Sequence, residues 1–276
     1  MVAELSVELI GQVEQAAQLL QSAKRVCILT GAGISAESGI PTFRDKQTGL
    51  WEKFRAEDLA SPVAFARDPK LVWSWYQWRR QLVHDKAPNP AHQALAQWQA
   101  ASSSLGQHVT LITQNVDDLH EQAGSDAIHL HGHLWKNRCS QCDSVYEDNA
   151  KDKPLDFDEQ LITCPHCGSY IRPDIVWFGE ALPVAAWQMA EEAAANCDVF
   201  MSIGTSSLVY PAAGLAQLAK QNGAKIIEVN PNPTPSTVVD ITLAAKAGAV
   251  MPVLINQLID KTDKECIKVR AKYDLL

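Results

Sequence analysis

Short apolar runs alternate along the chain with segments in which apolar residues recur at helical spacing. The runs have the length of buried strands, and helical patterns separate them. A strand–helix–strand succession of this kind predicts an α/β fold, with a mostly parallel sheet and helices on both faces. The predicted strands are Val26–Thr30, Val109–Thr113, Ile128–Leu130, Asp198–Ile203 and Lys225–Val229.

Helical periodicity is clear at the N-terminus and in three later segments. Near the start of the chain, six apolar residues fall on one face of an amphipathic helix: Leu5, Leu9, Val13, Ala16, Ala17 and Leu20. The other predicted helices are Pro90–Ala101, Val184–Ala195 and Pro211–Asn222.

Polar or glycine-rich loops follow four of the predicted strands. Ligands of open parallel sheets bind beyond the carboxyl ends of the strands, so we expect these loops to converge on one site. The four loops are Gly31–Gly33, Gln114–Asp117, Gly204–Ser206 and Asn230–Asn232.

Two segments interrupt the alternation. Residues 51–85 are helical and rich in aromatic residues, whereas residues 133–172 are highly charged and show little periodicity. We interpret both as insertions that form a small lobe. This interpretation predicts a large domain of residues 1–50, 86–132 and 173–276, and a small domain of residues 51–85 and 133–172.

Composition narrows the possible functions. The chain has 276 residues, enough for a large domain with a small satellite. Its net charge of −8 argues against a nucleic-acid partner, and no apolar run is long enough for a membrane span. The first residues resemble neither a secretory signal nor a transit peptide, which predicts a cytoplasmic protein.

Four of the seven cysteines form two C-x-x-C pairs, Cys139/Cys142 and Cys164/Cys167, separated by 21 residues. Two such loops complete a tetrahedron of thiolates, which predicts a structural zinc ribbon. A thiol–disulfide oxidoreductase is the alternative, because Cys-Pro-His-Cys alone resembles such an active site. That chemistry needs a helix after the motif, and Gly168 and Pro173 oppose one. The single cysteines, Cys27, Cys197 and Cys266, are interpreted as small buried apolar residues.

The glycines after the first predicted strand would let the backbone approach a pyrophosphate. Their spacing is G-x-G-x5-G, whereas dinucleotide-binding dehydrogenases have G-x-G-x-x-G. The acidic residue expected about 20 positions later has no convincing candidate. An ordinary dehydrogenase is therefore disfavoured.

The motifs occur in a fixed order. Gly31-Ala-Gly-Ile-Ser-Ala-Glu-Ser-Gly-Ile-Pro-Thr-Phe-Arg44 precedes Thr113-Gln-Asn-Val-Asp117 and His131-Gly132, and the cysteine pairs come next. Val176-Trp-Phe-Gly-Glu180, Gly204-Thr-Ser206 and Val229-Asn230 complete the succession. Over residues 25 to 255 the chain resembles the sirtuin family, whose members are NAD-dependent protein-lysine deacylases.

The resemblance implies a Rossmann-like large lobe, a small lobe of zinc ribbon and helical insertion, and NAD in the cleft between them. It implies that His131 is the catalytic base, which takes a proton from a ribose hydroxyl. The implied cofactor-binding residues are Gly31, Ala32, Gly33, Ala36, Phe43, Arg44, Gln114, Asn115, Asp117, Gly204, Thr205, Ser206, Asn230, Asn232 and, more weakly, Ala247.

His129 and His133 flank the predicted base. A His-x-His-x-His run would place three rings on one face of a strand, so a three-histidine metal site is an alternative. The His131-Gly132 context favours His131 acting alone.

The resemblance also implies how acylated substrates bind. Val176 and Phe178 would lie along the peptide, which would pair with this segment by strand addition. Tyr76 and Arg79, three residues apart, match the pair that reads the distal carboxylate in the sirtuin branch removing malonyl, succinyl and glutaryl groups. Ala60 matches a small residue that widens that pocket. A guanidinium and a hydroxyl suit a carboxylate physically.

Three alternatives to that activity remain open from the sequence. One is a general lysine deacetylase, in which Arg79 is a surface residue. Another is an NAD-dependent protein ADP-ribosyltransferase on the same fold. The last is a zinc-ribbon protein that only senses NAD, which the complete set of His131, Asn115 and Asp117 opposes.

Overall fold

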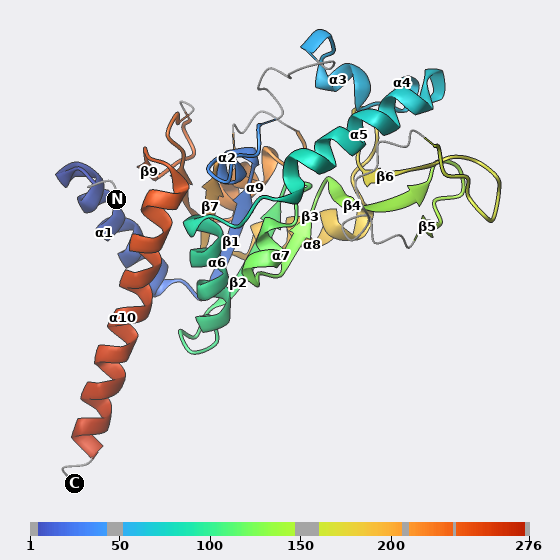
Figure 1. Cartoon of the computed structure of the whole chain (residues 1–276). Helices are drawn as coiled ribbons and strands as arrows, with labels where there is room; N and C mark the ends of the chain where they lie inside the picture. The colour runs from blue at the N-terminus through green and yellow to red at the C-terminus, as the bar shows by residue number, and fades with distance from the viewer. Residues whose placement is uncertain (1–4, 43–51, 147–159, 206–209, 234–235, 274–276) are drawn as a thin grey trace.

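The computed structural model describes residues 5–42, 52–146, 160–205, 210–233 and 236–273, with side chains described as far as residue 260 (Figure 1). A six-stranded sheet has the order β3-β2-β1-β7-β8-β9, and all neighbouring strands are parallel. The predicted α/β class is confirmed. The strands are β1 (Arg25–Thr30), β2 (His108–Thr113), β3 (Ala127–His129), β7 (Val199–Ile203), β8 (Lys225–Val229) and β9 (Ile241–Leu243).

All five predicted strands are present with small shifts at their ends. Asp198 lies just outside β7, and its carboxylate accepts hydrogen bonds of 2.8 Å from the amides of Lys24 and Arg25. β9 escaped prediction because it spans only three residues and pairs only with β8. A strand this short has no periodicity of its own.

Helices cover both faces of the sheet, as predicted. Along β1, Val26 and Ile28 face one core, whereas Cys27 and Leu29 face the other, because successive side chains of a strand point to opposite faces. The first core is closed by α1 (Val7–Ser22), α6 (Pro90–Ala101) and α10 (Ala247–Tyr273), and the second by α8 (Val184–Asn196) and α9 (Gly214–Gln221).

Local sequence explains where several helices begin. Ser6 caps α1 through a 3.2 Å hydrogen bond from the Leu9 amide. Asn89 caps α6, and Pro90 occupies its first turn, where a missing amide proton costs nothing. α9 begins at Gly214, later than predicted, because the preceding residues form a turn.

A second sheet is antiparallel, with the order β5-β4-β6. It packs against three helices from the predicted helical insertion through a shared core that includes Trp75, Leu134 and Ile175. Figure 1 shows these elements beside one end of the large sheet. The domain boundaries stay a prediction. The elements are β4 (Gly132–Cys139), β5 (Val145–Tyr146), β6 (Ile171–Ile175), α3 (Ala56–Leu59), α4 (Pro62–Arg67) and α5 (Pro69–His84).

Two short helices, α2 (Ala32–Ala36) and α7 (Leu119–Ala123), follow β1 and β2. The longest helix is α10, whose far end extends away from the sheet in Figure 1. Within the described part of the chain, no helix combines the length and apolar character needed to cross a membrane.

Two buried histidines lie side by side beneath the carboxyl edge of the sheet. The rings of His92 and His120 are 4.8 Å apart, and His120 Nε2 lies 3.0 Å from Thr30 Oγ1. Burial lowers the pKa of His92 to about 4 and the pKa of His120 to about 3. Both rings are therefore neutral near pH 7.

We expect acid to destabilise the fold through these two rings. The unfolded chain protonates a histidine near pH 6.5, whereas the folded rings resist protonation until about pH 4 and 3. The free energy of unfolding is therefore highest above pH 6.5, where both states hold neutral rings, and it falls as the pH drops below 6.5. From pH 7 to 5, each ring should cost about 2 kcal/mol of unfolding free energy.

Urea unfolding at several pH values measures this loss. His120→Gln should reduce the change of unfolding free energy with pH by the amount that one ring contributes. His108→Gln, which replaces an exposed histidine, should leave that change as it is in the wild type. An unchanged slope in His120→Gln would contradict the assignment.

Candidate active site

The loop after β1 lies directly against the loop after β7. The Gly31 amide donates to the Ile203 carbonyl at 3.0 Å, and the Gly33 amide donates to the Gly204 carbonyl at 2.8 Å. A Cβ on Gly33 would lie 2.6 Å from the Gly204 oxygen, and Gly204 has a φ of +61°. Both positions therefore require glycine. The sequence predicts that these glycines let the backbone approach a pyrophosphate. The structure shows another role, because their lack of a side chain allows the two loops to contact each other.

The loops after β2 and β8 join the same edge of the sheet. The Gln114 side chain donates to Thr205 Oγ1 at 3.1 Å, and the Asn230 side chain donates to the Thr205 carbonyl at 3.0 Å. The four polar loops thus converge, as predicted. They meet at the carboxyl edge, where open α/β proteins bind their ligands.

Asn115 and Asp117 are buried beside the Gly31 loop. Asn115 Nδ2 donates to the Gly31 carbonyl at 3.2 Å and to Ser35 Oγ at 3.0 Å. Burial raises the pKa of Asp117, although hydrogen bonds from the Leu119 amide and the Ser35 hydroxyl partly oppose this rise. Ser35 received no role from the sequence, although its place within the glycine motif was an available signal.

His131 lies between β3 and β4, with Nδ1 3.0 Å from the Gln114 carbonyl. Because a carbonyl oxygen only accepts, Nδ1 carries the proton and Nε2 keeps its lone pair. Burial lowers the pKa of His131, although the hydrogen bond to Gln114 partly opposes this. The ring is therefore neutral at pH 7. Its Nε2 can accept a proton from a bound molecule.

The other two histidines of the His-x-His-x-His run do not join His131. His129 Nε2 lies 2.8 Å from a Glu121 carboxylate oxygen, and the rings of His129 and His133 are 5.1 Å apart. Within the described residues, the metal-binding atoms that gather here come from Glu121, His129 and His133. The three-histidine alternative is therefore wrong.

Residues 176–178 connect His131 to the predicted acyl pocket. The Val176 amide donates to the His131 carbonyl at 3.0 Å, and the Phe178 amide donates to the Ala60 carbonyl at 2.9 Å. Ala60 is buried, whereas the Phe178 side chain is 49% exposed. The structure thus brings together residues that the sequence analysis assigned to one site from distant parts of the chain.

Strand addition by a peptide at this segment stays a prediction. Val176 and Trp177 follow β6 without regular structure, and Phe178 and Gly179 form a turn. The Val176 and Phe178 amides already donate to carbonyls, and the Trp177 amide donates to a Glu180 carboxylate oxygen at 2.8 Å. Because all three amides are engaged, an extended peptide would have to supply the donors for any pairing here.

Tyr76 lies in the core beneath this turn. Its hydroxyl oxygen accepts a 2.8 Å hydrogen bond from Trp177 Nε1, an indole group that can only donate. The hydroxyl proton of Tyr76 is therefore available for another acceptor. Burial raises the pKa of Tyr76 to about 12, which keeps that proton in place.

Arg79 is half-buried one turn further along α5. Its guanidinium lies 5.2 Å from the centroid of the Trp75 ring and interacts electrostatically with Tyr76 and Asp117. Burial lowers the pKa of Arg79, but a guanidinium remains charged at every physiological pH. This arginine therefore places a positive charge among aromatic side chains.

The neighbouring Arg80 has a different environment. It is 1% exposed, its Nε donates to the Leu134 carbonyl at 2.8 Å, and its Nη2 donates to Asn137 Oδ1 at 2.8 Å. Arg80 therefore joins α5 to β4. The interpretation of Arg79 as a plain surface residue is not supported, since Arg79 is half-buried beside Tyr76.

A buried ion pair that the sequence analysis missed shapes the turn. Arg172 Nη1 and Nη2 donate to the two Glu180 carboxylate oxygens at 2.6 and 2.9 Å, and Nη2 also donates to the Ile175 carbonyl. Burial alone would raise the pKa of Glu180, but the hydrogen bonds from Arg172 and the Trp177 amide hold it below its usual value. An arginine inside a strand and a glutamate after Gly179 were the available signals.

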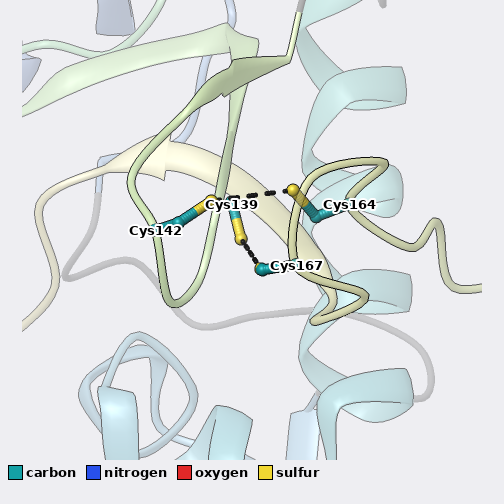
Figure 2. Close-up of side chains that lie close together, drawn as sticks. All are labelled: Cys139, Cys142, Cys164 and Cys167. Atoms are coloured by element: carbon teal, nitrogen blue, oxygen red, sulfur yellow. Dashed lines mark hydrogen bonds between the residues drawn. The ribbon is translucent and has the colours of Figure 1, made fainter.

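The four paired cysteines gather at one end of the small sheet. Figure 2 shows their side chains pointing toward one another from two loops. Cys139 and Cys167 sulfurs are 3.4 Å apart, and Cys142 and Cys164 sulfurs are 3.7 Å apart. Cys164 is followed by turns, so no helix extends from the second pair. The arrangement opposes the redox alternative.

Comparisons with known proteins agree with this geometry. A family model described as the Sir2 family matches residues 31–211. The chain belongs to the Sir2 family. An NAD-dependent protein deacylase of Methylococcus capsulatus is 50% identical over 247 residues, which cover 87% of this chain and 94% of that protein. The resemblance to sirtuins is thereby confirmed, and the chain is an enzyme of the NAD-dependent protein deacylase type.

Solved structures of Sir2 homologues share the fold. A complex of a Sir2 homologue with NAD has a TM-score of 0.81 at 44% identity, covering 90% of this chain and 94% of that one. A Sir2 protein bound to a myristoylated histone peptide has a TM-score of 0.73 at 35% identity, covering 92% and 99%.

The described residues suit the two groups that Sir2 membership implies. For zinc, thiolates at 2.3 Å from an ion at the centre of a tetrahedron lie about 3.8 Å apart. The observed sulfur separations of 3.4 and 3.7 Å are close to this value. For NAD, the converging loops offer buried polar side chains at the carboxyl edge, together with the lone pair of His131 Nε2.

The predicted cofactor contacts all remain predictions. Phe43, Arg44 and Ser206 lie outside the described residues. Ala32 and Gly33 lie in α2, which ends at the exposed Ala36, and Asn232 is an exposed residue whose amide donates to Asn230 Oδ1. The Ala247 side chain is buried in the core at the start of α10. Any nucleotide contact there would have to come from its main chain.

We expect Cys164→Ser to abolish zinc binding at the four cysteines and to destabilise the small sheet, because an ion that joins the two cysteine loops contributes to their folding. Zinc content should fall by one ion per chain, as measured by elemental analysis, and the thermal midpoint should drop. Cys197→Ser is the control, since its thiol donates to the Ala194 carbonyl and a hydroxyl can replace it. An unchanged zinc content in Cys164→Ser would contradict the assignment.

Proposed function

We propose that this protein deacylase removes succinyl and malonyl groups from lysine side chains, and acetyl groups as well. The products are free lysine, nicotinamide and 2′-O-acyl-ADP-ribose. The observation that carries the proposal is the half-buried charge of Arg79 beside the protonated hydroxyl of Tyr76. This pair provides donors for a carboxylate at the far end of an acyl group.

The surroundings of the pair favour this use. Ala60, Phe65 and Trp177 belong to the same apolar core as Tyr76. A carboxylate buried among such side chains without a partner would cost several kcal/mol. A guanidinium fork and a hydroxyl can offset that cost through charge-assisted hydrogen bonds. An acetyl group lacks the carboxylate and gains nothing from the pair, yet it is smaller and would still fit.

His131 is the proposed general base. When bound, NAD supplies the ribose carbon that receives the acyl oxygen as nicotinamide leaves. His131 Nε2 would then take a proton from a ribose hydroxyl, which its neutral ring can do at pH 7. The bond between Nδ1 and the Gln114 carbonyl holds the ring in the required tautomer and stabilises it once protonated.

The proposed substrates are proteins or peptides with acylated lysines. A Sir2 protein bound to a myristoylated histone peptide supports this class, as does the exposed Phe178 side chain beside the buried Ala60. Because Val176 ties this segment to the His131 carbonyl, a lysine lying along it would approach the base.

We expect Arg79→Met to lower kcat/KM for a succinyl-lysine peptide by about 100-fold, which corresponds to about 3 kcal/mol of transition-state binding. Turnover of the matched acetyl-lysine peptide should change little. NAD-dependent release of deacylated peptide, followed by mass spectrometry, measures both.

The matched control is Arg67→Met, which makes the same change at an exposed position on α4. Tyr76→Phe removes only the hydroxyl and should give a smaller loss confined to the succinyl peptide. If acetyl is the preferred group and Arg79→Met behaves like wild type, the chain is a general deacetylase. Transfer of label from NAD to protein, without acylated ADP-ribose, would instead indicate ADP-ribosyl transfer.

We expect His131→Asn to lower deacylation by 100-fold or more, the usual contribution of a general base. Binding of NAD, measured by calorimetry, should weaken little, because the described contacts of the ring involve only Gln114. Comparable losses of binding and turnover would contradict the role of His131 as the base.

A further inference from the structure

A second group of metal-binding side chains lies apart from the four cysteines. Glu121 on α7, His129 at the end of β3 and His133 at the start of β4 each offer one donor atom, and these atoms all lie within 4.8 Å of one another. We propose that these three residues bind a divalent transition metal, with zinc the best match. Nothing in the deacylase reaction proposed above uses them as ligands.

The donor set has the right chemistry. Two imidazoles and one carboxylate bind zinc, with nitrogen and oxygen ligands at about 2.0–2.2 Å and a fourth position open to water. His129 Nε2 and the Glu121 oxygen are 2.8 Å apart, whereas two such ligands on a tetrahedral ion lie about 3.4 Å apart. The two side chains would therefore have to separate by about 0.6 Å to admit the metal.

Both ring nitrogens of His129 face oxygen acceptors. Nδ1 lies 3.0 Å from the Asn115 carbonyl and Nε2 lies 2.8 Å from a Glu121 carboxylate oxygen, so each nitrogen carries a proton in the metal-free protein. A divalent metal would replace the proton on Nε2, while Nδ1 keeps its bond to Asn115. Ligating histidines commonly donate their second nitrogen to a carbonyl, which fixes the ring and strengthens it as a ligand.

His133 would lose only one weak hydrogen bond on binding the metal. Its ring centroid lies 5.1 Å from that of His129, and its Nδ1 accepts only a long hydrogen bond of 3.3 Å from the Trp135 amide. Coordination through either nitrogen would at most replace this weak contact.

Charge and access also suit a cation. Asp117 and Glu121 act on His129, whereas Asp118 and Glu121 act on His133 against the opposing charge of Lys136. Asp118 itself is engaged by Gln122 Nε2 and Trp135 Nε1, which leaves Glu121 as the carboxylate for the ion. Glu121 is exposed and both histidines are partly exposed, so an ion can enter from solvent.

The test is titration of Zn²⁺ into the zinc-loaded enzyme, followed by calorimetry and by zinc counting after gel filtration. The expected result is a second ion per chain in the wild type, with affinity reduced at least tenfold in Glu121→Gln, His129→Asn and His133→Asn. His108→Asn, an exposed histidine elsewhere, and His131→Asn should both retain the second ion.

Two outcomes would overturn the proposal. One is a wild type that binds only the ion of the four cysteines. The other is loss of the second ion in His131→Asn, which would restore the three-histidine arrangement. Should the variants fold poorly, Co²⁺ added to the wild type decides. A second cobalt without a new thiolate-to-cobalt absorption band supports nitrogen and oxygen ligands, whereas growth of that band places the ion on cysteine and refutes the site.

Discussion

The backbone contact between the loops after β1 and β7 is the constraint on which the site depends. With Gly33 and Gly204 pressed together, no side chain can stand between these loops. The polar residues of the neighbouring strands then pack around that contact, Asn115 by bonding the Gly31 carbonyl and Gln114 by bonding Thr205. A side chain at either glycine would separate the loops and with them the residues predicted to bind the cofactor. The backbone contact thus determines where the polar side chains of the site lie.

A second, electrostatic constraint acts on the acyl side. The buried pair of Arg172 and Glu180 closes the turn after β6, and the Trp177 amide shares the same carboxylate. Trp177 in turn fixes the hydroxyl of Tyr76. The position of a residue on α5 is therefore determined by an ion pair on another element. Removing Glu180 is costly, because the charge of Arg172 stays buried.

Much of the architecture could be predicted because its causes are local. Apolar runs marked the strands of the large sheet, Asn89-Pro90 marked a helix start, and the spacing of the cysteine pairs indicated zinc. The rest depends on contacts between distant residues. β9 forms only because β8 is beside it, Ser35 matters only through Asn115 and Asp117, and Arg172 meets Glu180 only after the turn has formed. The approach of Glu121 to His129 likewise requires α7 and β3 to be in place.

His131 makes one contact through its ring and another through its main-chain carbonyl. Its ring contacts the Gln114 carbonyl, whereas its main-chain carbonyl accepts a hydrogen bond from the Val176 amide of the segment that carries Phe178. The second hydrogen bond is independent of which side chain stands at position 131. A variant without the imidazole therefore keeps the main-chain contact that positions the segment proposed to bind the peptide. Under the proposed role of His131, such a variant would bind acylated proteins without releasing them, which would allow the natural substrates to be isolated from a mixture.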